Sequence, residues 1–137
     1  MRPNYINGKY SVVFDKYSER HYEKDFKKKY KSNWLATKQS IIDTLERIAN
    51  LDGMGVVDPI CKSNKDTFLL KFDFAIAKSG VSPKGSGNRC ILDVCNNSCC
   101  VKILLIYCKH HIDRPDGQET IWWQEKIKEN FELHCTS

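Results

Sequence analysis

Apolar and polar residues alternate along several short segments, and alternation of this period predicts strands. The β-branched and aromatic residues 9–14 predict a first strand. In residues 67–76, every second position from Leu70 onward is apolar, which places Lys71 and Asp73 together on the other face. These two segments lie far apart in the sequence, so the first strand must join a sheet at its edge or between other strands.

A hairpin is predicted further along, where residues 89–94 and 101–107 flank the turn residues 96–98. The segment 101–107 is the most apolar of the chain and therefore predicts an interior strand. The long loop 77–88 is rich in Gly and Ser, which predicts a mobile connection that lets backbone approach a ligand. Residues 53–66 read as irregular because Asp58-Pro59 interrupts them.

Three segments repeat apolar residues at helical spacing instead. Ser18 is the expected N-cap of the first helix, with Glu19 in its first turn. Residues 34–51 and 119–131 form the second and third. The apolar faces consist of Tyr22, Phe26 and Tyr30 in the first helix, Trp34, Ile41, Leu45, Ile48 and Leu51 in the second, and Trp122, Trp123, Ile127 and Phe131 in the third. One of the two adjacent tryptophans is expected in the core and the other is a candidate for partner contact.

The order of these elements predicts an α+β domain. We expect one domain over residues 1–137, with a small, mostly antiparallel sheet of about four strands. An N-terminal helical hairpin would pack on that sheet, and a C-terminal helix would follow it.

The composition, with 41% hydrophobic and 28% charged residues, is ordinary for a soluble globular protein. The chain has no apolar run long enough to span a membrane and its N-terminus is too polar for a signal peptide, so we expect a cytoplasmic protein. The net charge of +5 permits a polyanionic partner without requiring one. An early lysine cluster, residues 24–31, is most simply a solvated helix face.

The seven cysteines do not predict a disulfide framework in a chain without a secretory signal. Cys95, Cys99 and Cys100 flank the hairpin turn, but their spacing has no second pair of the kind that zinc sites use. We therefore expect no metal and no cofactor. A zinc-stabilised module, with Cys108 and the neighbouring histidines as added ligands, is the weakest alternative.

In this order of elements the chain resembles the RelE/ParE superfamily of bacterial toxins, in particular its RelE and HigB-like branch. The resemblance covers residues 9–109. It rests on an opening strand with a basic helix (KYSVVFDKYSERHYEKDFKKKY), a strand carrying Lys71, a basic Gly/Ser approach to an arginine (SPKGSGNRCILDV) and a last apolar strand ending in basic residues (VKILLIYCKHHI). The chain departs from the family in its longer loop before Arg89, in its two-tryptophan helix and in histidines where arginine is common.

The resemblance implies the toxin of a type II toxin–antitoxin module, an mRNA interferase that cleaves mRNA, usually on the ribosome, and is silenced by a cognate antitoxin. Cleavage by the ribose 2′-hydroxyl needs a base, a cation for the pentacovalent phosphate and an acid for the leaving oxygen. A guanidinium suits phosphate, and histidine exchanges protons near neutral pH. The expected catalytic residues are Lys71, Arg89, His110 and His111, and the expected RNA contacts are Lys84, Lys109 and Tyr107.

Less specific interpretations stay open for these residues. Arg89 could simply pair with Asp73 or Asp93, Lys71 could serve only solubility, and the histidines could be solvent-exposed. At the level of function, the same fold could act on DNA gyrase, although the histidines favour RNA chemistry. It could also be a non-enzymatic domain that binds nucleic acid or protein.

Overall fold

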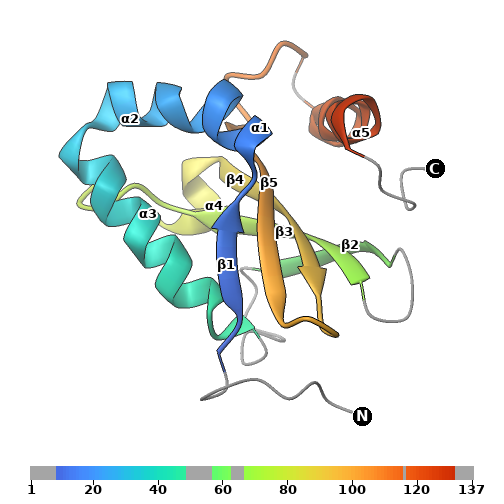
Figure 1. Cartoon of the computed structure of the whole chain (residues 1–137). Coiled ribbons are helices and arrows are strands. Elements are labelled where there is room, and N and C mark those ends of the chain that lie inside the picture. Colours follow the sequence, from blue (N-terminus) through green and yellow to red (C-terminus); the bar gives the residue numbers. More distant parts are fainter. Residues whose placement is uncertain (1–8, 49–56, 63–66, 116, 132–137) are drawn as a thin grey trace.

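The computed structural model describes residues 9–48, 57–62, 67–115 and 117–131. Its centre is a mixed five-stranded sheet in the order β1-β5-β4-β3-β2 (Figure 1). The strands are β1 (Ser11–Phe14), β2 (Val57–Lys62), β3 (Thr67–Phe74), β4 (Asn88–Cys95) and β5 (Cys100–Cys108). β1 runs parallel to β5 at one edge, and the other neighbouring pairs are antiparallel. The strongly apolar β5 is an interior strand, as predicted.

The prediction that residues 53–66 are irregular is wrong for β2, and the sheet therefore has one strand more than expected. β2 pairs with β3 and lies at the edge of the sheet. Proline cannot donate a hydrogen bond to a neighbouring strand, but an edge strand has one side without a partner. Pro59 is accommodated there, next to an irregularity between Pro59 and Cys61. The remaining residues of that segment, 53–56 and 63–66, lie outside the described residues.

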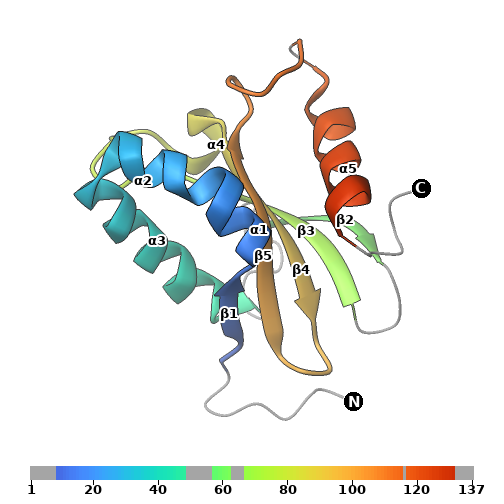
Figure 2. The same ribbon diagram turned by 45° about the horizontal axis from the view of Figure 1, so that its top comes forward.

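One face of the sheet is covered by the helical segments α1 (Lys16–Ser18), η2 (Glu19–Glu23), α2 (Lys24–Tyr30) and α3 (Ser32–Leu45) (Figure 2). The expected cap at Ser18 is wrong, because the helix begins three residues earlier than that cap would place it. Asp15 is the N-cap, and its side chain accepts a hydrogen bond from the backbone N–H of Tyr17. The chain turns sharply at Lys31, whose φ of 54° ends α2 before α3 begins.

The core under these helices follows the apolar faces predicted for them. Trp34, Ile41 and Leu45 of α3 are buried, and Tyr22 and Phe26 pack against the same cluster. Leu51 lies outside the described residues. No helix in the described ranges is long and apolar enough to cross a membrane.

Helix α5 (Glu119–Asn130) covers the opposite face of the sheet (Figure 2). Its apolar side chains pack on a second cluster made by residues of β3, β4 and β5. Trp122 and Trp123 are only 8% and 4% exposed, so both are buried, whereas only one of them was expected in the core. Two adjacent bulky residues can both be buried because α5 is held on a broad sheet face.

The loop 77–88, expected to be mobile, contains the single-turn helix α4 (Pro83–Ser86). The Ser82 side chain caps this turn by accepting a hydrogen bond from the N–H of Gly85. The hydroxyl of Ser86 lies 2.7 Å from the carbonyl oxygen of Phe74 on β3. These bonds attach the second half of the loop to the end of the sheet.

Candidate active site

A row of polar side chains crosses the face of the sheet that α5 covers. Asp73 on β3 is the cross-strand partner of Arg89 on β4, and Arg89 is the partner of Tyr107 on β5. Directly opposite residues on neighbouring strands have side chains close enough to interact. The row therefore places a carboxylate, a guanidinium and a phenol side by side at one end of the sheet.

The guanidinium of Arg89 is buried, with 6% of the residue exposed, and both of its terminal nitrogens donate to backbone carbonyl oxygens. Its Nε lies 3.1 Å from Oδ1 of Asp73. Its Nη1 donates to the carbonyl oxygen of Asn88 at 3.1 Å and to that of Pro83 at 3.5 Å, and Nη2 donates to that of Lys84 at 3.4 Å. Arg89 thus joins the sheet to α4, and the pairing with Asp73 that the sequence left open is present.

Glu119, in the first turn of α5, contacts both Tyr107 and Arg89 of this row. Its Oε2 accepts a hydrogen bond of 2.5 Å from the hydroxyl of Tyr107 and lies 3.9 Å from Nε of Arg89. Burial, followed by the hydrogen bond to Glu119, raises the pKa of Tyr107 far above its usual value. A carboxylate is also favoured at the start of a helix by the helix dipole.

The other basic residues expected at the site lie around this network. Lys71 is half-buried on β3, two residues from Asp73, so both side chains belong to the same sheet face. Lys84 is exposed on α4, and its carbonyl oxygen is an acceptor for Arg89. Lys71 is therefore a diagonal neighbour of Arg89 on this face, and the backbone of Lys84 lies beside the guanidinium.

The turn after β5 packs tightly on the end of α4. The N–H of Lys109 donates to the carbonyl oxygen of Gly87 at 2.8 Å. A Cβ atom added to Gly87 would lie 2.8 Å from Cδ2 and 2.9 Å from Nε2 of His110, closer than real side chains allow. Gly87 also has a φ of 79°, which L-residues rarely adopt. A glycine is therefore required both for the backbone and for the place of the His110 ring.

The two adjacent histidines open onto different cavities. His110 lines a hollow of about 370 Å³, which we call the turn hollow. Its lining residues are Lys109, His110, Ile112, Pro115, Gly117, Glu119 and Thr120. His111 instead lines a cavity of about 390 Å³ on the other side of the turn, which we call the aromatic cavity. Strand alternation could separate the two rings, but it could not show which cavity each ring reaches.

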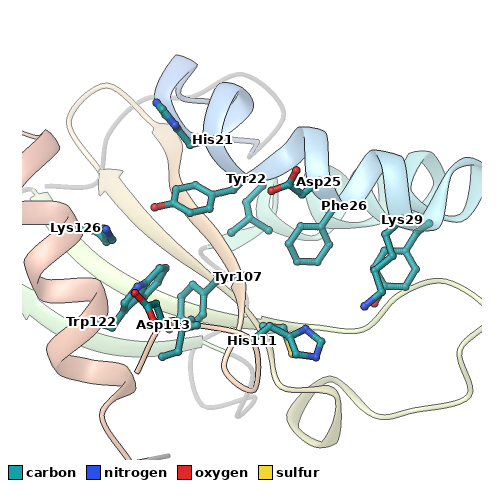
Figure 3. A pocket seen from close by; sticks show the side chains of 14 residues that line it. His21, Tyr22, Asp25, Phe26, Lys29, Tyr107, His111, Asp113, Trp122 and Lys126 are labelled. Carbon is teal, nitrogen blue, oxygen red and sulfur yellow. The ribbon is translucent and has the colours of Figure 1, made fainter. Parts of the chain in front are cut away.

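The aromatic cavity lies between the helical segments η2 and α2 on one side and α5 on the other, next to the end of β5 (Figure 3). Its lining residues are His21, Tyr22, Asp25, Phe26, Lys29, Tyr30, Ile106, Tyr107, Cys108, His111, Ile112, Asp113, Trp122 and Lys126. The pKa of Tyr22 is raised by its burial and then by its hydroxyl contact with Tyr17, 3.3 Å away. Sequence reasoning missed this cavity because the stripe of Tyr22, Phe26 and Tyr30 was interpreted as core alone.

Within the described residues, no group of three or more His, Cys, Asp or Glu side chains is arranged to hold a metal ion. Five of the cysteines are free thiols, namely Cys90, Cys95, Cys99, Cys100 and Cys108. The chemical groups that the site offers are thus ammonium, guanidinium, imidazole, carboxylate and phenol.

No protein-family model matches the sequence, and a search of curated proteins found no match either. Among solved structures, the chain is similar to one in the crystal structure of the archaeal RelE–RelB complex from Pyrococcus horikoshii OT3. The TM-score is 0.53 at 16% sequence identity, over 76% of this chain and 99% of that one. The likeness supports a RelE-like fold, as the resemblance in sequence pattern predicted.

Proposed function

We propose that this protein is the toxin of a toxin–antitoxin module and cleaves mRNA as a metal-independent endoribonuclease. The observation that carries the proposal is the turn hollow, where His110 and Lys109 lie with Glu119 at the end of β5. The hollow adjoins the Arg89 network, on a fold similar to that of a protein from a RelE–RelB complex. In this proposal the protein acts in the cytoplasm, on or near the ribosome, and a cognate antitoxin silences it.

His110 is the residue best placed for proton transfer in the proposed reaction. It takes the proton of a ribose 2′-hydroxyl, whose oxygen forms a bond to phosphorus while the bond from phosphorus to the 5′-oxygen breaks. Lys109 supplies positive charge for the phosphorane, and its ammonium is a proton donor for the leaving 5′-oxygen. Both side chains come from one turn, which Gly87 anchors by accepting the Lys109 N–H.

Arg89 has a supporting role in this proposal rather than a direct contact with phosphate. Its donors are used by Asp73 and by the carbonyl oxygens around α4. It holds Lys84 at the rim, where the exposed ammonium can contact the RNA backbone. Lys71 adds positive charge behind the ion pair, and Tyr107 keeps Glu119 oriented.

Cleavage of a single-stranded RNA by the purified protein tests the proposal, together with growth and mRNA integrity in bacteria that express it. We expect His110→Ala to lower the cleavage rate about 10²–10⁴-fold. Lys109→Ala should also lower it, because positive charge at the phosphorane is lost. Lys102→Ala, an exposed lysine at the other end of β5, is the matched control and should cleave like the wild type.

Two results would overturn the proposal. One is a wild-type protein that neither cleaves RNA, free or on ribosomes, nor arrests growth. The other is a His110→Ala variant that cleaves as fast as the Lys102→Ala control.

The engagement of Arg89 favours a second candidate, a non-enzymatic domain of the same fold that binds RNA or protein through its basic surface. A phosphate clamp would need exposed guanidinium donors, whereas the Arg89 guanidinium is buried and both of its terminal nitrogens already donate to backbone carbonyl oxygens. Tight RNA binding without cleavage by the wild type would support this candidate over the ribonuclease.

A further inference from the structure

The aromatic cavity adjoins the turn hollow through two consecutive residues. His110 lines the hollow and His111 lines the cavity, and consecutive Cα atoms are only about 3.8 Å apart. An RNA strand with a phosphate at the turn hollow would therefore have a neighbouring nucleotide beside the aromatic cavity. The inference below rests on the proposed RNA substrate.

The walls of the cavity are suited to a flat ring. Tyr22 and Phe26 line the cavity from the helical side, and Trp122 of α5 meets Tyr22 edge to face, with ring centroids 6.2 Å apart (Figure 3). The Trp122 ring is itself held by Tyr107, with ring centroids 4.8 Å apart. Bases stack on aromatic side chains whatever their sequence. A volume of about 390 Å³ is near the lower end for small-molecule pockets and suits one nucleoside better than a longer segment.

The rim of the cavity carries positive charge toward both ends. Figure 3 shows Lys29 toward one end and Lys126 toward the other. A base in a strand has a phosphate on each side, so cations at both ends match that pattern better than they match an apolar peptide side chain. Two carboxylates, Asp25 and Asp113, also line the cavity. Carboxylates accept hydrogen bonds from the amino groups of adenine, cytosine and guanine, which uracil lacks.

We propose that the aromatic cavity binds one base of the single-stranded RNA, next to the cleaved phosphate, and prefers a base that carries an amino group. The base packs against the contacting rings of Tyr22 and Trp122 and against Phe26, and Lys29 and Lys126 neutralise the flanking phosphates. The cavity thereby makes a small contribution to the sequence preference of cleavage, and the cleaved phosphate lies in the turn hollow.

The first test removes one base at a time from the RNA and leaves the protein intact. The probe is a single-stranded RNA of about eight nucleotides, a length within the usual site size for such proteins. Its 2′-hydroxyls are methylated so that it cannot be cleaved. We expect an abasic residue at one position to weaken binding roughly tenfold or more, and abasic residues elsewhere to have little effect. At that position uracil should bind more weakly than adenine, cytosine or guanine.

The second test asks whether the sensitive RNA position is bound in the aromatic cavity, and it uses a matched pair of protein variants. Lys29→Ala should lower the steepness of log Kd against log salt by about 0.7, the loss of one phosphate contact on a single strand. Lys28→Ala removes the same charge from the next position of α2, outside the cavity lining, and should change it less. Asp25→Asn should reduce the preference against uracil. Because Asp25 is exposed, this substitution should leave the fold intact.

The outcomes separate this inference from the proposed ribonuclease. Cleavage with uniform sensitivity to abasic positions, or with Lys29→Ala equal to Lys28→Ala, would refute the base pocket and leave the ribonuclease intact. Position-dependent binding without any cleavage would support the pocket and refute the ribonuclease. A Lys29→Ala variant that loses affinity for an antitoxin but keeps that for RNA would assign the cavity to a protein partner and overturn the inference.

Discussion

Arg89 and Asp73 form a buried ion pair across β3 and β4, with Nε 3.1 Å from Oδ1 and side chains that are 7% and 4% exposed. Buried pairs of this kind are costly to break, because the remaining charge has neither water nor a partner. Glu119 approaches the same guanidinium less closely, at 3.9 Å, and so replaces Asp73 only in part.

The first prediction concerns this pair. Asp73→Ala should lower the free energy of unfolding by about 3–5 kcal/mol, because it leaves the Arg89 charge buried. The double variant Asp73→Leu with Arg89→Met should lose much less unfolding free energy than the sum of the losses in Asp73→Leu alone and Arg89→Met alone. Urea unfolding at neutral pH measures both. Asp43→Ala, an exposed carboxylate of α3, is the control, and strictly additive effects of the double variant would contradict the prediction.

A second prediction follows from the raised pKa of Tyr107. The unfolded chain releases this phenolic proton near pH 10, whereas the folded protein retains it. The folded state therefore loses stability relative to the unfolded state as pH rises above about 10. Tyr107→Phe should cost about 1.5–3 kcal/mol at pH 7, where its hydrogen bond to Glu119 is lost, and the cost should shrink by pH 11.

Urea midpoints of the wild type and Tyr107→Phe at pH 7 and pH 11 check this convergence. The pKa of Tyr22 is also raised, so some alkaline loss of stability should persist in the Tyr107→Phe variant. A constant difference between the two proteins at both pH values would be inconsistent with the assignment to Tyr107.

A third prediction compares two glycines that share a positive φ. Gly87 (φ 79°) lies against His110, whereas Gly80 (φ 73°) has no atom near its missing Cβ. Gly80→Ala should cost about 1–2 kcal/mol from backbone strain alone. Gly87→Ala should cost more and should also reduce RNA cleavage, because it displaces His110. Thermal unfolding and cleavage assays on both variants measure this, and equal effects would argue against a tight contact.

A fourth prediction concerns thiol reactivity at the hairpin turn. Hydrogen bonds from Ser98 lower the pKa of the Cys95 thiol, whereas burial raises that of Cys100 beside it. Thiolate is the nucleophile, so iodoacetamide should modify Cys95 faster than Cys100 at pH 7.5. Ser98→Ala should slow the Cys95 reaction. Peptide mass spectrometry follows both sites, and the fully buried Cys90 should react only after unfolding.

Periodicity was sufficient to predict the type of most elements because it is a local property. The faces of α3 and α5 and the alternation in β3 follow directly from residues close together in the chain. β2 was missed because Asp58-Pro59 reads as a break, although an edge strand tolerates proline. The fixed part of the loop 77–88 was missed for a different reason. Its order comes from the hydroxyl of Ser86, which bonds the backbone of Phe74 on β3, and from the buried Arg89 side chain, which bonds the backbone of α4.

For the candidate site, the sequence could name Arg89, Lys109 and the two histidines only as candidates, because few other residue types suit phosphate chemistry. Their surroundings depend on strand register and on the placement of α5, which bring together residues dozens of positions apart. Register set Asp73 opposite Arg89, and α5 added Glu119 above it. Local alternation could separate the His110 and His111 rings, but the cavity that each ring lines depends on the long-range packing of α4, α5 and the N-terminal helices around the turn after β5.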